Sequence, residues 1–288
     1  MQETNNGSLL AKRLGVDIFA ASTAAFGVSP FIAIVDRSII ENASGREKLG
    51  KALKQGFIHL FTRPFNFIRS PSFFLVFGVY AATYSTANTI DTICAYTKQD
   101  NQTPKFLGTT IANMTTCIYK DRAFTRMFGL VAPKGLPWSS YGYFAARDAL
   151  TIAASFNIPP TLAKEFQDRK IILDSETSQN VAQLICPAAV QFISCALHLL
   201  GLDIYNRPGE SMLSRLQFLQ RTYLKTTITR IARIGPAFGI GGVGNRVIRE
   251  RVNEMVDQKD RSLSNLTINA ATIPATNAAT SSNTSANQ

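Results

Sequence analysis

Ionisable and amide side chains lie inside several stretches of the chain that are otherwise apolar. Arg147 and Asp148 are adjacent near the middle of the apolar segment 137–158, and His198 is the only ionisable residue of segment 181–203 before its terminal acid. Ionisable groups at such positions usually face a cavity or each other and indicate a functional site; an ion pair between neighbours in a soluble helix is the alternative. The polar groups predicted to bind a substrate in this way are Arg147, Asp148, Asn88, His198, Asn245 and Arg246.

In each of three apolar runs, an acid is followed closely by a base. The acids are Asp36, Asp121 and Asp203, which lie 85 and 82 residues apart. A nearly constant spacing of this kind is typical of an internal repeat. We interpret the three acids as the inner ends of three membrane-spanning helices.

The elements that hold these groups are predicted to cross a membrane. Segment 14–35 contains 22 residues and a single charge, Asp17, and about 20 residues at 1.5 Å each span a hydrocarbon core. A buried helix of a soluble protein is the alternative for such a segment. The apolar segments that we interpret as six spans are 14–35, 73–96, 106–119, 137–158, 181–203 and 236–243.

Positive charge is concentrated in the connections between these segments. Residues 46–69 carry six bases, with apolar residues spaced by three and four, which predicts a basic amphipathic helix at a membrane surface. Arg126 and Lys134 make the middle connection basic, 207–233 is basic again, and 164–176 is close to neutral. Because basic connections stay on one side of a membrane, both termini are predicted on the other side, as six spans require.

The overall composition limits the possible partners. The net charge is +11, with 45% hydrophobic and 17% charged residues, an average that a helical bundle around a watery interior would have. The positive charge calls for nucleic acid, anionic lipid or an anionic solute as partner. The bases match no nucleic-acid reader module, so no nucleic acid is expected. The four cysteines and two histidines show no metal-ligand spacing, so neither a metal nor another cofactor is expected.

Local patterns complete the predicted organisation. Segment 239–244 matches GxGxxG, but no predicted strand precedes it, so we interpret it as close helix packing. The N-terminus has no basic region before an apolar core, so no cleaved signal peptide is expected. After Arg261 the chain has no charge, which predicts disorder. The predicted parts are a tail 1–12, a transmembrane domain 13–256 with repeats at about 13–98, 104–160 and 176–256, and a disordered tail 257–288.

Short segments of the chain resemble one known family. They are Ser29-Pro-Phe31, Tyr80-Ala-Ala-Thr-Tyr84, Lys120-Asp-Arg122, Leu197-His-Leu-Leu-Gly-Leu-Asp-Ile-Tyr-Asn-Arg207 and Gly235-Pro-Ala-Phe-Gly239. Together with three tandem units of span, basic surface helix and span, they resemble the mitochondrial carrier family, in particular a divergent fungal branch. The resemblance covers roughly residues 12–256. It implies an all-α six-helix bundle of three helix–surface helix–helix repeats around a central cavity, in the mitochondrial inner membrane rather than the outer.

The resemblance also bears on the charged residues. The carrier signature has an acid two residues after the proline and a base three residues further on, but the positions after Pro30 hold Ile32 and Val35. We expect a monomer whose basic connections contact anionic lipid such as cardiolipin. The charges at the ends of the apolar runs would form a substitute ring of gate ion pairs, made of Asp36, Arg37, Asp121, Arg122, Asp203 and Arg207.

Functions of different classes remain open from the sequence. One is a mitochondrial solute carrier that moves a small anionic or zwitterionic metabolite by alternating access. Another is a degenerate carrier-like membrane adaptor or scaffold that transports nothing. A soluble enzyme or binding module is the third, but two histidines do not allow a convincing Ser/His/Asp or Cys/His constellation, so we expect no enzyme.

Overall fold

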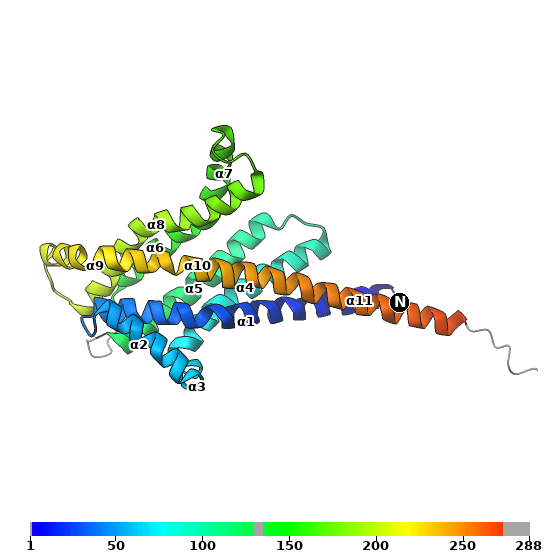
Figure 1. Ribbon diagram of the computed structural model, residues 1–288, viewed down its shortest axis with the longest axis horizontal. Coiled ribbons are helices and arrows are strands. Elements are labelled where there is room, and N and C mark those ends of the chain that lie inside the picture. Colours follow the sequence, from blue (N-terminus) through cyan, green and yellow to red (C-terminus); the bar gives the residue numbers. More distant parts are fainter. Residues whose placement is uncertain (1, 130–134, 273–288) are drawn as a thin grey trace, which may run out of the picture. The chain divides into compact units, whose positions relative to one another are not determined.

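The computed structural model describes residues 2–129 and 135–272, and in these ranges its regular structure is helical, without strands. The predicted all-α class is therefore confirmed. Figure 1 shows the helices along the chain, in which η1 and η2 are π-helical. The elements are α1 (Gln2–Ala43), α2 (Leu49–Thr62), α3 (Pro64–Ile68), α4 (Pro71–Thr97), α5 (Gln102–Phe128), α6 (Trp138–Ile152), η1 (Ala153–Asn157), α7 (Ile158–Asp168), α8 (Ser175–Asn206), α9 (Met212–Ala232), α10 (Ile234–Pro236), η2 (Ala237–Val243) and α11 (Gly244–Thr272).

The first helix, α1, is 42 residues long and contains Pro30 without ending there. It packs along α4, and its residues Ala20, Ala21 and Ala25 are fully buried. Small side chains allow two helix backbones to approach closely, so these alanines suit a helix in a tightly packed bundle. Ser38 donates a hydrogen bond to the carbonyl oxygen of Ile34 at 2.7 Å. This buried hydroxyl is therefore satisfied within its own helix.

Two helices in the described ranges are long and apolar enough to cross a membrane, Gly7–Ala43 within α1 and Thr177–Asn206 within α8. Both expose large apolar side chains, including Phe19 and Phe26 on α1 and Phe192 and Ile193 on α8. The remaining predicted spans fall within α4, α5, α6 with η1, and η2, which do not meet the same test. The arrangement of six spans in three repeats therefore stays a prediction.

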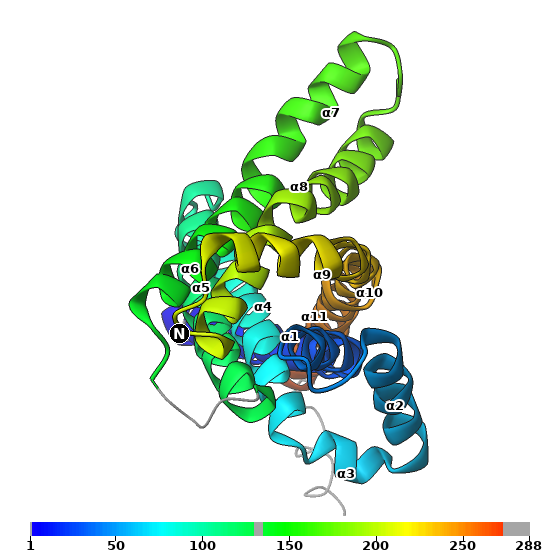
Figure 2. The same ribbon diagram turned by 90° about the vertical axis from the view of Figure 1, so that its left-hand side faces the viewer.

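The predicted basic surface helix forms as two short helices. Figure 2 shows α2 and α3 on the outside of the bundle, where α2 contacts α1 and α3 contacts α4. Leu49 and Ala52 of α2 are buried, whereas Phe61 is 78% exposed. The middle connection between α5 and α6 includes Lys134, which lies outside the described residues.

Prolines stand at or directly before the start of two helices, and another lies inside a helical stretch. α4 begins at Pro71, and the side chain of Ser70 caps its first turn. α6 begins at Trp138, directly after Pro137. Pro236 instead ends the short α10 in the middle of a helical stretch. A proline removes a helical hydrogen bond, and the wider turns of η2 follow immediately.

The glycine-rich segment 239–244 lies in η2 and at the start of α11, and no strand precedes it in the described ranges. Gly241 is buried, and a Cβ atom at this position would collide with Tyr84 of α4. The Tyr84 hydroxyl donates to the carbonyl oxygen of Ala237 at 3.3 Å. These contacts support the interpretation of the segment as close helix packing.

The chain divides into two compact units, Met1–Arg249 and Glu250–Gln288. The second unit differs from the disordered tail that was predicted from residue 257, because α11 is helical to Thr272. Extending an existing helix adds one hydrogen bond per residue without a new nucleation step, so a helix begun at Gly244 continues into polar sequence. Residues 273–288 of the predicted tail lie outside the described ranges.

Candidate functional site

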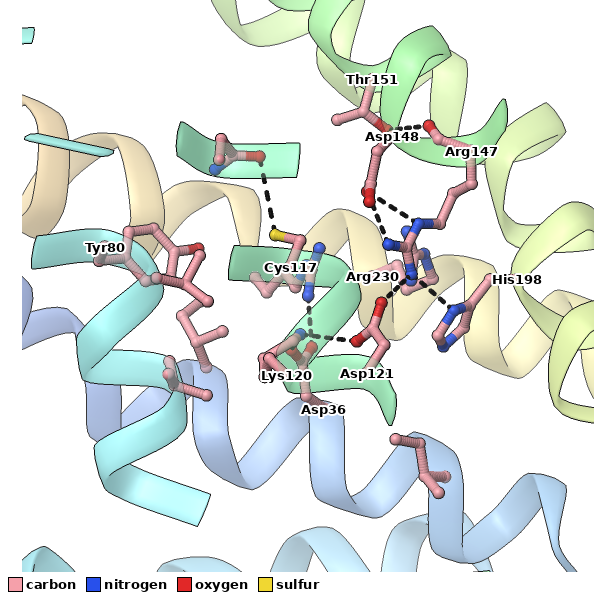
Figure 3. A pocket seen from close by; sticks show the side chains of 16 residues that line it. Asp36, Tyr80, Cys117, Lys120, Asp121, Arg147, Asp148, Thr151, His198 and Arg230 are labelled. Atoms are coloured by element: carbon pink, nitrogen blue, oxygen red, sulfur yellow. Dashed lines mark hydrogen bonds and ion pairs between the residues drawn. The ribbon is translucent and has the colours of Figure 1, made fainter. Parts of the chain in front are cut away.

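A cavity of about 150 Å³ lies between the helices of the first unit. Its walls are formed by residues of α1, α4, α5, α6, α8 and α9, and by Arg233 directly after α9. Figure 3 shows that its polar side chains converge from helices far apart in the sequence. The polar and ionisable residues that line it are Asp36, Tyr80, Asn113, Cys117, Lys120, Asp121, Arg147, Asp148, Thr151, His198, Arg230 and Arg233.

Packing between α6 and α8 brings charged groups of both helices together. Ser140 of α6 donates to the carbonyl oxygen of Gly201 in α8 at 2.9 Å. One turn further along α6, the buried ring of Phe144 lies 5.6 Å from that of His198. Arg147 follows Phe144 by three residues and so shares its helix face. The same interface therefore places Arg147 against His198.

All three nitrogen atoms of the Arg147 guanidinium group contact neighbouring polar side chains. Its Nε and Nη2 donate to Oδ1 of Asp148 at 3.0 and 2.6 Å. Its Nη1 lies 2.6 Å from Oδ2 of Asp121 and 2.8 Å from Nδ1 of His198. A guanidinium has no acceptor, so Nδ1 of His198 must accept this hydrogen bond. Arg147 thus links α5, α6 and α8 in one buried network.

Asp36 is the second centre of this network. Lys120 from α5 and Arg233 from the end of α9 donate to its two carboxylate oxygens. Lys120 also lies 3.1 Å from Oδ1 of Asp121, which joins the Asp36 and Arg147 contacts. We call these residues the cavity cluster: Asp36, Lys120, Asp121, Arg147, Asp148, His198 and Arg233.

Because the cavity cluster is buried, breaking one of its ion pairs would cost considerable stability. Asp36 is 6% exposed and Asp121 is 2% exposed. Charges removed from water are tolerated when each is paired and hydrogen-bonded, but separating such a pair costs about 3–5 kcal/mol. The cluster therefore ties α1, α5, α6 and α8 together in one specific arrangement.

A second polar cluster connects α1, α4 and α11. Asp17 is fully buried, its Oδ1 accepts from Arg249 Nε at 2.5 Å and its Oδ2 accepts from Thr92 at 2.5 Å. Asn88 and Asn245 exchange amide hydrogen bonds of 2.9 and 3.0 Å. We call these five residues the Asp17 cluster. Asp17 precedes Asp36 by 19 residues in α1, which corresponds to about 28 Å along the helix axis.

The structure brings together only part of the predicted substrate-binding set. Arg147, Asp148 and His198 line the cavity. Asn88 and Asn245 belong instead to the Asp17 cluster. Arg246 is exposed on α11. A polar residue in an apolar segment can face either cluster, and sequence position does not say which.

The predicted gate ring also assembles only in part. Asp36 and Asp121 are in the cavity cluster, but Arg37 pairs with Glu41 at 2.9 Å, and Arg122 is exposed. Consecutive residues point about 100° apart on a helix, so a base directly after an inward acid faces elsewhere.

The third predicted gate acid lies in a separate contact. Asp203 binds Arg207 of its own helix and Arg215 of α9, the latter at 2.5 Å. Arg207 is four residues after Asp203, the spacing at which two helical side chains meet. This pair therefore closes the α8–α9 connection and does not join the cavity cluster.

Sequence reasoning missed three cations of the cavity: Lys120, Arg230 and Arg233. Lys120 was seen only as part of the segment that it shares with Asp121. Arg230 and Arg233 were counted among the bases of the connection 207–233. Their spacing of three residues puts both on one helix face, and this was the available signal.

Comparison with known proteins corrects the resemblance to the mitochondrial carrier family. A family model described as "Probable citrulline exporter" matches residues 20–253 of the chain. This is a different family from the mitochondrial carriers, and the carrier signature is absent after Pro30. No curated protein matches the chain.

Proposed function

The chain belongs to the probable citrulline exporter family, and we propose that it is a membrane transporter that exports citrulline or a closely similar zwitterionic metabolite. The observation that carries this proposal is the cavity cluster, a set of buried charges around a hollow inside an apolar helical bundle. Ionisable groups in such a setting indicate a solute pathway. The family description and the two long apolar helices favour a transporter over an enzyme.

The cavity has a size that suits a small solute. One water needs roughly 10–15 Å³ of such space, and the cavity of about 150 Å³ is roughly ten times larger. Its lining includes charged groups together with hydroxyl and amide groups such as Thr151, Tyr80 and Asn113. Outside the bundle, the exposed Phe19 and Phe192 suit contact with lipid chains.

Two clusters at different levels of the bundle suggest how a solute would pass. The cavity cluster connects α1 with α5, α6 and α8. The Asp17 cluster connects α1 with both α4 and α11. The estimated 28 Å between them along α1 approaches the roughly 30 Å of a hydrocarbon core. We propose alternating access, in which one cluster separates while the other stays formed, so that no continuous pore opens.

The location within the cell stays a prediction. A mitochondrial membrane, the inner rather than the outer, was expected from the sequence, with anionic lipid such as cardiolipin at the basic connections and a monomeric chain. Lys54 of α2 and Arg69, directly after α3, are exposed and suit anionic headgroups. Cell fractionation followed by carbonate extraction tests this location.

Efflux from proteoliposomes tests the transport proposal directly. Purified protein is reconstituted into vesicles loaded with labelled citrulline, and release is compared with protein-free vesicles. We expect release with the wild type and a loss of at least tenfold with Arg147→Gln, which breaks the cavity cluster. Arg169→Gln removes the same charge at an exposed position and should behave as the wild type. Wild-type release of citrulline and related amino acids no faster than from protein-free vesicles would refute transport and favour a membrane adaptor.

A further inference from the structure

Two side chains in the cavity keep unused binding capacity after the ion pairs have formed. Asp148 is 7% exposed, and its Oδ2 has no hydrogen-bond partner among the described residues, whereas Oδ1 accepts two hydrogen bonds from Arg147. Arg230 is 3% exposed, and its Nε donates to Oε1 of Gln191 at 2.9 Å. In the part of the chain that the structure describes, neither Nη1 nor Nη2 of Arg230 makes a hydrogen bond or an ion pair. Both side chains line the same cavity (Figure 3).

The charges around the cavity are unequal. Three carboxylates and four lysine or arginine side chains line it. Lys120, Arg147 and Arg233 each contact at least one of these carboxylates. Among the described residues of this lining, Arg230 is the cation that contacts none of the three carboxylates. A buried guanidinium without a counter-charge is unfavourable, so its surroundings favour a bound anion.

We infer that the cavity recognises the head group of an α-amino acid, with Arg230 binding its carboxylate and Oδ2 of Asp148 binding its ammonium group. An arginine fork binds a carboxylate through two parallel hydrogen bonds. An ionised carboxylate is an acceptor, which suits an ammonium donor. A zwitterion supplies both charges in one molecule and adds no net charge to the buried site. A simple anion would satisfy only Arg230, and a simple cation only Asp148.

The surroundings of Arg230 hold it for this role. Gln191 of α8 accepts from Arg230 at 2.9 Å and from Ser194 at 3.2 Å, and its amide nitrogen donates to the carbonyl oxygen of Pro187 at 3.1 Å. Gln191 is therefore a positioning residue that fixes the Nε side of the guanidinium. The two remaining nitrogens are left for a ligand.

The test compares citrulline with two analogues in proteoliposomes, and it rests on the proposed transport function. N-acetylcitrulline lacks the ammonium group, and the α-carboxamide of citrulline lacks the carboxylate. Wild-type protein should prefer citrulline over each analogue at least tenfold in kcat/KM, since a hydrogen bond to a charged group has an effect of about ten- to hundredfold. Equal use of all three compounds by the wild type would overturn the inference.

Substitutions assign the two roles. Arg230→Gln should reduce the preference for citrulline over the carboxamide about tenfold or more, with little effect on the N-acetyl comparison. Asp148→Asn should reduce the preference for citrulline over N-acetylcitrulline, with little effect on the carboxamide comparison. Arg230→Lys should recover part of the preference for citrulline over the carboxamide, because lysine keeps the charge without the fork. The exposed Arg169→Gln and Asp168→Asn are the matched controls. A merely structural role would lower all rates together and leave both preferences unchanged, which would overturn the assignment.

The outcomes separate this inference from the proposed function. If the wild type moves citrulline but the variants keep both preferences, the head-group assignment is wrong and the transport proposal stands. If the wild type moves another α-amino acid but not citrulline, and the variants shift its analogue preferences, the cargo is wrong and the head-group site stands. If no α-amino acid moves, and none raises the unfolding temperature of the wild type, both are refuted.

Discussion

Removal of the Arg147 charge leaves the carboxylate of Asp148 with less compensating charge than that of Asp121. In the described part of the chain, no other cation contacts Asp148, whereas Asp121 keeps Lys120 at 3.1 Å. An uncompensated buried charge costs about 3–5 kcal/mol, and each kcal/mol lowers the Tm of a chain of this size by roughly 2–4 °C. We therefore expect Arg147→Gln to lower the Tm by roughly 6–20 °C.

The double variant Arg147→Gln/Asp148→Asn should be more stable than this single variant. It removes both charges, so no unpaired carboxylate remains at position 148, although the contacts of Arg147 with Asp148, His198 and Asp121 are lost. The single variant loses the same contacts, so the double variant should recover much of the about 3–5 kcal/mol that the unpaired Asp148 charge costs. One additional substitution thus restores stability, because it removes the stranded charge.

The cysteines provide the assay for this comparison. Cys94, Cys186 and Cys195 are free and buried, so a thiol-reactive dye reports their exposure as detergent-solubilised protein is heated. Arg169→Gln serves as the control for loss of an arginine at an exposed site. A double variant that unfolds at the same temperature as Arg147→Gln, or lower, would show that the stranded Asp148 charge is not the source of the instability.

The same thermal assay checks two packing predictions. Gly241→Ala should lower stability by roughly 1–2 kcal/mol, since overpacking against Tyr84 outweighs the helical gain of alanine. Gly242→Ala, where nothing lies within 4 Å of the added carbon, should be neutral or stabilising; equal effects would contradict the predicted collision. Asn88→Ala should cost about 1–3 kcal/mol, because it leaves the buried amide of Asn245 without its partner. An unchanged Tm would show that this amide pair does not contribute to stability.

Properties that depend on nearby residues could be predicted from the sequence. The length and apolar character of segments 14–35 and 181–203 identified the two helices of the described ranges that are long and apolar enough to cross a membrane. The position of Arg147, Asp148 and His198 inside apolar segments was enough to propose that they face a shared interior, and they line the cavity. Helix periodicity and the free-energy cost of placing a charge in an apolar medium are properties of a single segment. They can therefore be recognised without knowing which segments pack against it.

The choice of partners was decided only by the tertiary structure. The ring predicted from acid–base neighbours would include Arg37, yet Asp36 pairs with Lys120 and Arg233, which are 84 and 197 residues away in sequence. In the sequence, Arg230 is one of several bases in the connection 207–233. Only the packing of α9 against α8 shows that it is buried beside Gln191. An ion pair depends on the distance between two groups once their helices have packed, and that distance is set by which helix faces meet across the bundle, not by spacing along the chain.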